Sequence, residues 1–217
     1  MNFDVPHLAV DIETLAWSET SVIATLGATM FHFKNDANLT YQEVLDKTFY
    51  VKLDVKDQIK RFGRTTDKDT IEWWKKQPLA VQEMSIKSKD DDVKLDDMMV
   101  KFKEYLFLNN FDFYNSYIWT RGIAYDIPKL ESSFKRVADD ENKNSYNCDF
   151  VGYVKPKDKY IINTFRARDI RTFHDLVGDV DNGKWELPSG RPDEFVEHHA
   201  KHDIALDVMK LLYLYNN

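Results

Sequence analysis

Two acidic residues near the start of the chain have the spacing of a metal-binding pair. Asp11 and Glu13 lie in a stretch, His7 to Glu13, whose apolar residues alternate. Because side chains alternate between the two faces of a strand, both carboxylates project from one face, while Val10 and Ile12 project from the other. Such a pair is costly to bury without cations. It indicates either oxygen ligands for a hard divalent ion or an exposed edge strand with hydrated acids.

Further polar candidates lie in the second half of the chain. Asp126 follows a strand and turn pattern, Tyr117 to Gly122, and precedes Pro128, which favours the first turn of a helix. Taken alone, Asp126 is typical of a helix N-cap. Close to the end, the segment Glu197-His198-His199-Ala200-Lys201-His202-Asp203 combines three imidazoles with carboxylates. These residue types can bind a metal or transfer protons.

The histidines allow two other interpretations. His198 and His202 are four residues apart, as zinc-binding pairs on helices are, but no Glu follows His198 and no third soft ligand is evident. His202-Asp203 and His174-Asp175 are dipeptides of the kind found in metal-dependent phosphohydrolases of the all-helical HD class. The β-rich first third of the sequence argues against that class.

In combination these residues resemble a known family. Three short motifs occur in this order along the chain: Asp11-x-Glu13-Thr14, Tyr125-Asp126 and His198-x-Ala200-x-x-Asp203. They resemble the three motifs of the DEDDh branch of 3′-5′ exonucleases, a branch defined by four acids and one histidine. Three longer stretches look like the T-even bacteriophage exonucleases of that branch and the related bacterial exoribonuclease-like domains: Thr70 to Gln77, Arg121-Gly122-x-x-Tyr125-Asp126 and Arg168 to Thr172. The resemblance implies a bacteriophage or bacterial origin.

The resemblance also implies a fold. It is an RNase H-like α/β fold with a central mixed sheet flanked by helices, in which the first strand carries Asp11 and Glu13. Residues 1–217 would form a single 3′-5′ exonuclease domain. One departure is that Arg121-Gly122 stands where many proofreading exonucleases have an Asn.

The implied mechanism is a two-metal hydrolysis of phosphodiester bonds at single-stranded 3′ ends. By resemblance, two Mg²⁺ or Mn²⁺ ions would be held by Asp11, Glu13, Asp126 and Asp203. His198 would be the general base, and we expect the nearby acids to favour its charged form. Helical geometry alone favours His199, which lies four residues before Asp203, whereas the family spacing places His198 on a loop or a frayed first turn.

Several residues are expected to contact the substrate. Trp73 and Trp74 lie about 100° apart on a helix and cannot share one face. We expect one in the core and the other at the cleft, where it can stack on a base, with burial of both in the core as the alternative. The candidate contacts are Thr14, Leu15, Trp74, Arg121, Tyr125 and Arg168. Two basic groups could also follow phosphates, with ordinary surface charge as the alternative for the first: Lys56, Lys60, Arg61, Arg64 and Lys68, then Arg166, Arg168 and Arg171.

Periodicity predicts the elements that position these residues. Strands are expected over 7–13, 21–33, 47–55 and 117–120, and helices over 67–77, 95–109, 127–138 and 195–215, with Pro78 interrupting the first helix. The segment 148–165 is either a hairpin or an insertion.

Composition limits the class of protein. The 217 residues, 43% of them hydrophobic, suffice for one core. No apolar run approaches the roughly 18 residues that cross a bilayer, and no signal peptide is evident, so we expect a cytoplasmic protein, in the host cytoplasm if it is a phage protein. The one cysteine, Cys148, excludes an internal disulfide and a multi-thiolate zinc site.

Charge bears on the substrate. The chain has 30 Lys and Arg against 37 Asp and Glu, a net charge of -7, so the basic footprint of a protein that binds long duplexes is missing. We expect single-stranded 3′ ends as partners, DNA in preference to RNA. The alternatives are an exoribonuclease with the same site and a catalytically silent nucleic-acid-binding or interaction protein of the same fold.

Overall fold

The computed structural model describes residues 1–139, 163–178 and 185–217. Residues 148–162 of the predicted hairpin or insertion, including Cys148, lie outside the described residues. The strands are β1 (His7–Thr14), β2 (Ile23–Phe31), β3 (Phe49–Lys52), β4 (Tyr117–Thr120) and β5 (Ala167–Asp169). The helices are α1 (Tyr41–Lys47), α2 (Val55–Phe62), α3 (Lys68–Trp74), α4 (Leu79–Ser85), α5 (Leu95–Leu108), α6 (Ile123–Ala138), the short 3-10 helix η2 (Thr164–Arg166), α7 (Ile170–Val177) and α8 (Ala200–Asn216).

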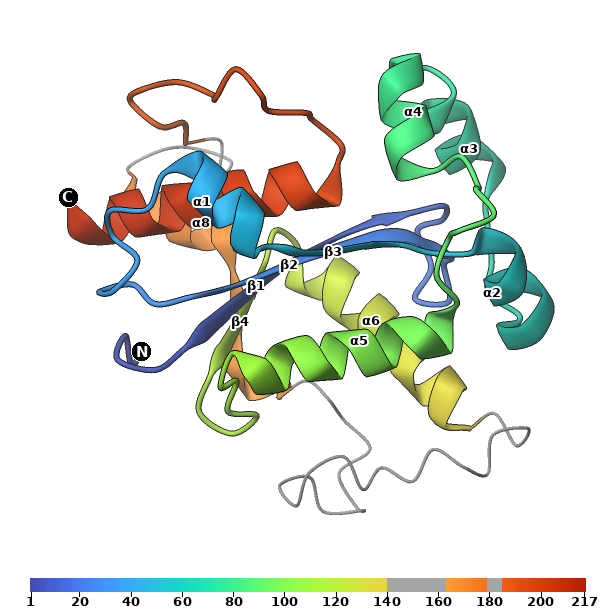
Figure 1. Ribbon diagram of the computed structural model, residues 1–217, viewed down its shortest axis with the longest axis horizontal. Coiled ribbons are helices and arrows are strands. Elements are labelled where there is room, and N and C mark those ends of the chain that lie inside the picture. Colours follow the sequence, from blue (N-terminus) through green and yellow to red (C-terminus); the bar gives the residue numbers. More distant parts are fainter. Residues whose placement is uncertain (140–162, 179–184) are drawn as a thin grey trace.

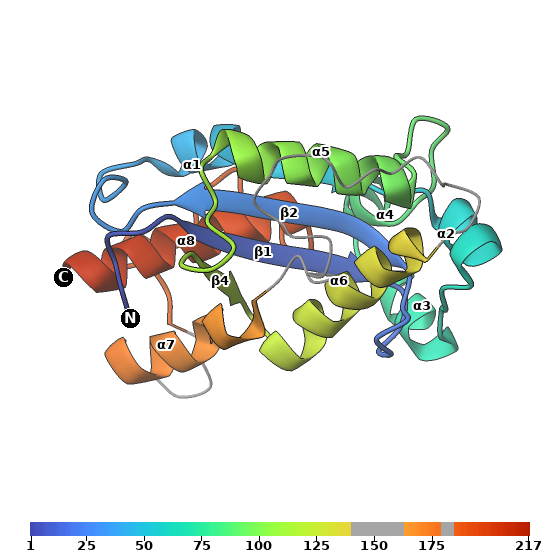
Figure 2. The same cartoon turned by 90° about the horizontal axis from the view of Figure 1, so that it is seen from below.

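The strands form one mixed sheet in the order β3-β2-β1-β4-β5. β2 runs antiparallel to β1 and β3, whereas β4 is parallel to β1 and to β5. Helices cover both faces, with α1 and α8 on one and α5 and α6 on the other (Figure 1, Figure 2). The expectation of an RNase H-like α/β fold with a central mixed sheet is therefore confirmed.

The alternation in β1 assigns its two faces. Leu8, Val10 and Ile12 pack in one hydrophobic cluster with apolar residues of α5 and α6. Ala9 belongs to the cluster on the opposite face, which α1 and α8 cover. Because residues two apart share a face, Asp11 and Glu13 point toward the side of α8.

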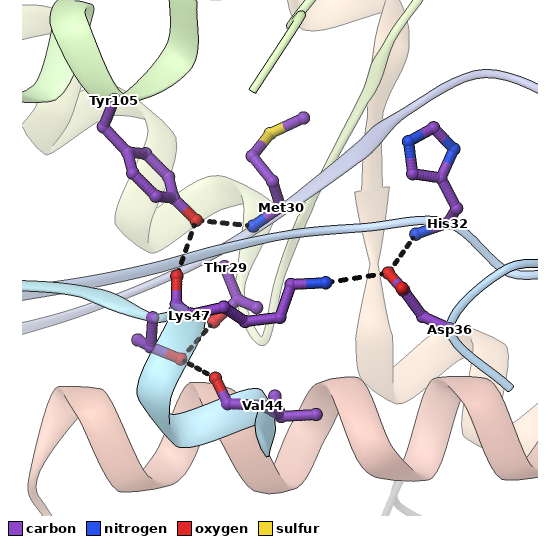
Figure 3. A network of polar contacts seen from close by, with 8 residues as sticks. Thr29, Met30, His32, Asp36, Val44, Lys47 and Tyr105 are labelled. Carbon is purple, nitrogen blue, oxygen red and sulfur yellow. Dashed lines mark hydrogen bonds and ion pairs between the residues drawn. The ribbon is translucent and has the colours of Figure 1, made fainter. Parts of the chain in front are cut away.

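The far end of β2 extends beyond its short partner β3 and is covered by side chains instead. Pairing with β3 ends at Ala28, and the next outward backbone N–H, that of Met30, donates to the Tyr105 hydroxyl of α5 over 2.8 Å (Figure 3). The Thr29 and Thr48 hydroxyls are hydrogen-bonded at 2.7 Å. In the same network Lys47 pairs with Asp36 at 2.9 Å, and Asp36 also accepts from the backbone N–H of His32 (Figure 3). These contacts satisfy an exposed sheet edge and fasten α1 to it.

Several element boundaries differ from the sequence predictions. Pro78 does not merely interrupt a helix, because it is the N-cap of α4. The predicted third strand, 47–55, contains only the four residues of β3, since its ends belong to α1 and α2. α6 begins at Ile123, after the N-cap Gly122, so the interpretation of Asp126 as an N-cap is wrong. No helix within the described ranges is long and apolar enough to cross a membrane.

Two members of the first basic group are bound within the protein. Arg64 is almost fully buried and donates to the backbone oxygen of Ser21 over 2.8 Å and to the Ser132 hydroxyl over 3.1 Å. Arg61 pairs with the buried Asp96 at 2.8 Å. Neither guanidinium is therefore available to follow phosphates.

Candidate metal centre

Three of the four predicted acids meet above the middle of the sheet. Asp11 and Glu13 of β1 and Asp203 of α8 each offer a carboxylate oxygen, and these oxygens lie within 4.8 Å of one another. All three residues are half-buried. Within the described ranges this is the only group of three or more such ligands.

A glycine on the neighbouring strand allows α8 to come this close. Gly27 of β2 pairs with Asp11, and a Cβ built on Gly27 would lie 2.3 Å from the backbone oxygen of Ala200. Any side chain at this position would therefore collide with the first turn of α8. Gly27 is required for the approach that brings Asp203 to β1.

The start of α8 also orients Asp203. The N-cap residue His199 makes no side-chain cap hydrogen bond. Its backbone N–H instead donates to Asp203 Oδ2 over 2.9 Å, so the carboxylate folds back onto the end of its own helix. A carboxylate at a helix N-terminus is favoured by the helix dipole.

Asp126 approaches the same end of the sheet from α6. It lies in the first turn of that helix and is 4% exposed. Burial raises its pKa to about 7, although the cations Lys129 and Arg171 oppose the shift. Because Asp126 is not in the three-acid group, the structure brings the fourth predicted ligand near the centre but not into direct contact with the other three.

The pKa values of the clustered acids favour a bound cation. Burial and mutual repulsion raise the pKa of both Asp11 and Glu13 well above the usual range, and that of Asp203 to about 8. The acids therefore share protons at neutral pH unless a cation replaces those protons. An all-oxygen donor set fits a hard divalent ion such as Mg²⁺ or Mn²⁺.

The alternative zinc pair is not assembled. The Nδ1 of His202 is hydrogen-bonded to the Tyr41 hydroxyl at 2.9 Å. The ring of His198 lies instead beside Trp73 of α3, with the ring centroids 4.8 Å apart. Neither imidazole belongs to a group of potential ligands among the described residues.

His198 lies on the loop before α8, as the family spacing implies. Its φ angle of 62° is in the left-handed region, which is uncommon for a residue with a Cβ. The buried Ser85 hydroxyl of α4 donates to the His198 backbone oxygen over 2.7 Å. α3 and α4 therefore hold this histidine from both its ring and its backbone.

The expected charge of His198 was wrong. Burial lowers the pKa of its imidazole, and among nearby acids only Glu197 opposes that shift. Contact with the indole of Trp73 removes water from the ring, and the effect of this burial is larger than that of the Glu197 charge. The neutral imidazole is consequently favoured, which is the form a general base needs.

His199 has a different environment. Its ring stacks on Tyr50 with centroids 4.6 Å apart, and burial lowers its pKa to about 4. Its Nδ1 is buried and has no hydrogen-bond partner in the described structure. The local structure therefore removes the helical argument for His199, because this residue caps α8 rather than lying inside it.

The predicted contact of Trp74 with substrate is corrected by the structure. Only 1% of Trp74 is exposed, and its Nε1 donates to the backbone oxygen of Thr14 over 3.0 Å, so its ring cannot stack on a base. The adjacent Trp73 is 41% exposed. Packing of α3 against the end of β1 decides which indole is buried.

Thr14, Leu15 and Tyr125 lie together where β1 ends. The Thr14 and Tyr125 hydroxyls are 2.6 Å apart, which links β1 to the first turn of α6. Leu15 is buried beside Val22 in a small hydrophobic cluster.

The two predicted arginines are both engaged, in different places. Arg121 makes a two-point ion pair with the fully buried Asp207, one turn beyond Asp203 on α8. Arg168 donates to the backbone oxygen of Ala167 over 2.7 Å and lies over the ring of Tyr117. Because Tyr117 pairs with His7, the first residue of β1, the Arg168 guanidinium is turned away from Asp11, and its predicted substrate contact stays a prediction.

Sequence reasoning missed several residues of this site. Asp207 follows Asp203 by four residues, a spacing that indicates a shared helical face, so it could have been found. No sequence pattern points to Gly27 or Ser85. The same is true of Trp17, which is 76% exposed and whose ring meets that of Tyr125 edge-on, with the centroids 5.2 Å apart.

Comparisons with known proteins are consistent with this geometry. Residues 6–214 match the family described as the 3′-5′ exoribonuclease Rv2179c-like domain. The chain is 30% identical over 205 residues to an exodeoxyribonuclease of Enterobacteria phage T4, across 94% of this chain and 86% of that protein. The crystal structure of cell-death related nuclease 4 aligns with a TM-score of 0.43 and 11% identity, over 97% of this chain but only 64% of that one.

Proposed function

Because this chain belongs to the family of 3′-5′ exoribonuclease Rv2179c-like domains, we propose that it is a metal-dependent 3′-5′ exonuclease acting on single-stranded ends. Residues 1–217 would form one exonuclease domain, a proposal supported by the family match over 6–214. The observation that carries the proposal is the meeting of carboxylate oxygens of Asp11, Glu13 and Asp203 within 4.8 Å. Asp126 lies in the first turn of α6, and His198 lies on the loop before α8.

The proposed metal ligands are the four acids. Asp11, Glu13 and Asp203 would hold a divalent ion directly. Asp126, which is buried in the first turn of α6, would support a second ion. Two such ions, when bound, supply a positive charge that stabilises both the attacking and the leaving oxygen of a phosphodiester. Arg121, fastened by Asp207, would limit the repulsion among the acids.

His198 is the proposed general base. It would accept the proton of the attacking water, since its lowered pKa keeps the imidazole neutral at neutral pH. Ser85 and Trp73 would act as positioning residues, because one holds its backbone and the other packs against its ring.

The 3′-terminal nucleotide would be gripped beside the end of β1. Thr14 and Leu15 are proposed to contact it, as the family resemblance implies, with Tyr125 holding the Thr14 hydroxyl. The exposed Trp73, rather than Trp74, would stack on a base, and such stacking contributes about 1–3 kcal/mol per base.

We propose DNA as the preferred polymer, with RNA as the second candidate. The T4 relative, 30% identical over 94% of this chain, is an exodeoxyribonuclease, which supports DNA. The description of the matching family as an exoribonuclease domain favours RNA. The choice depends on how the site treats the 2′-hydroxyl.

The test is hydrolysis of 5′-labelled single-stranded oligonucleotides, using DNA and RNA of one sequence, with Mg²⁺ or Mn²⁺. We expect a ladder that shortens from the 3′ end, faster for DNA, and abolished by EDTA and by Asp126→Ala. No cleavage of either polymer with any divalent metal would overturn the proposal and favour a silent binding or interaction protein.

A further inference from the structure

Three cations lie close enough to the candidate metal centre to lower the pKa of at least one of its acids: Arg121, Lys129 and Arg171. Two of them are already engaged. Arg121 forms the two-point ion pair with Asp207. Lys129 is buried, donates to the backbone oxygen of Tyr125 over 3.2 Å and lies over the ring of that residue.

Arg171 differs from both. Its side chain is exposed, and no hydrogen bond or ion pair joins its guanidinium to another residue in the described ranges. Its backbone is nevertheless well held, because Asp169 caps α7 by accepting from the backbone N–H of Thr172 over 2.8 Å, and Ile170 is fully buried. A free guanidinium on a fixed helical turn is suited to binding an anion.

The sheet topology places Arg171 at the edge of the metal centre. β4 and β5 run parallel to β1, and Thr120 pairs with Asp169, so the chain leaves both strands at the end of the sheet where Asp11 lies. α6 then carries Asp126 in its first turn, and α7 carries Arg171 in its own. The attraction of Arg171 for both Asp11 and Asp126 agrees with this placement.

Resting on the exonuclease function above, we propose that Arg171 binds the substrate phosphate immediately 5′ of the phosphate that is cleaved. The cleaved phosphate must reach the half-buried acids, whereas Arg171 is exposed beside them. In cleavage at a 3′ end, only the terminal nucleotide lies beyond the cleaved bond, so any further phosphate lies on the 5′ side. A planar guanidinium can donate two parallel hydrogen bonds to its oxygens.

The test combines a protein change with a substrate change. Arg171→Ala and the wild type are compared on a single-stranded oligonucleotide and on the same oligonucleotide with an uncharged methylphosphonate at the second linkage from the 3′ end. Arg136→Ala, an exposed change of equal charge near the end of α6, is the control.

We expect Arg171→Ala to lower kcat/KM about tenfold on the all-phosphate strand, mainly by raising KM. The methylphosphonate should lower the kcat/KM of the wild type by a similar factor. It should lower the kcat/KM of Arg171→Ala hardly at all, because the contact that it removes is already missing in that variant. Arg136→Ala should behave as the wild type on both strands.

Two results would overturn the inference while leaving the exonuclease in place. One is a loss in Arg171→Ala that is equally large on both strands, and the other is no loss at all. Absence of hydrolysis by the wild type would instead refute the proposed function, and the assignment of Arg171 would fail with it.

Discussion

His198 and His199 are adjacent in the sequence but occupy different environments. The His198 ring is half-buried beside Trp73, whereas the His199 ring is buried against Tyr50. A base must exchange its proton with water at the site, which favours His198.

We therefore predict that His198→Ala lowers kcat by about 10²–10⁴-fold, the range for loss of a general base, while Mn²⁺ affinity measured by calorimetry is retained. His199→Ala should cost mainly stability, because it removes a buried ring packed on Tyr50. If His199→Ala is the more damaging change for kcat at a temperature where both variants are folded, the assignment of the base is wrong.

The raised pKa values of the acids at the metal centre lead us to expect an unusual dependence of stability on pH. Without metal, the folded protein holds protons that the unfolded chain releases near pH 4, since the pKa of Asp126 is raised to about 7 and that of Asp203 to about 8. When the pKa of a carboxyl group is higher in the folded protein than in the unfolded chain, the free energy of unfolding falls as pH rises from the unfolded pKa to the folded pKa. The lowered pKa of His199, about 4, acts in the opposite direction only below about pH 6.5.

Between pH 6.5 and 7.5 we accordingly expect the metal-free protein to become less stable as pH rises, by at most about 1.4 kcal/mol per pH unit for each proton released. Thermal unfolding in EDTA and in Mn²⁺ measures this, and the stabilisation by Mn²⁺ should grow over the same interval. Asp203→Asn should flatten the EDTA curve. A metal-free protein that gains stability over this interval would contradict the shared-proton picture.

At the scale of elements, the site depends on the contact between β2 and α8. Gly27 faces the first turn of α8, and its missing side chain allows Asp203 to reach Asp11. The obstacle is backbone, so a small movement of a flexible side chain cannot relieve the collision.

Gly27→Ala should therefore displace the start of α8, lowering both Mn²⁺ affinity and kcat/KM by about 100-fold or more, with an overpacking cost of about 1–3 kcal/mol in stability. Thr29→Ala, on the same strand, is the matched control. It removes the hydrogen bond to Thr48, costs about 1 kcal/mol and should leave metal binding intact. Retention of wild-type Mn²⁺ affinity in Gly27→Ala would show that the approach of α8 does not build the centre.

At the scale of the whole molecule, the net charge of -7 disfavours tight binding to long duplexes. The structure adds that Arg61 and Arg64 are committed to internal contacts. Cations available to nucleic acid are therefore fewer than the sequence count suggests.

We predict weak binding of duplex DNA that falls steeply between about 50 and 200 mM salt, and tighter binding of a strand with a free single-stranded 3′ end. Fluorescence anisotropy in the presence of Mn²⁺ measures both, using the Asp126→Ala variant, which we expect to be inactive. Duplex affinity that persists at high salt would be inconsistent with this charge distribution.

The fold and the types of residue in the centre were predictable from local patterns. Alternation in β1 placed Asp11 and Glu13 on one face, and helical spacing predicted α5 closely, because these patterns depend only on neighbouring residues and on one buried face. The motif order then implied an RNase H-like sheet, which the strand order confirms.

Only the tertiary structure decided how the residues meet. The sequence pattern does not say which of Trp73 and Trp74 is buried. The packing of α3 against the end of β1 buries Trp74. The left-handed backbone of His198 is hydrogen-bonded by Ser85, which lies far away in the sequence. The need for a glycine at position 27 arises only from the close approach of the Ala200 backbone. These contacts join segments distant along the chain, so no local periodicity reports them, whereas the patterns within β1 and α5 are set by residues only a few positions apart.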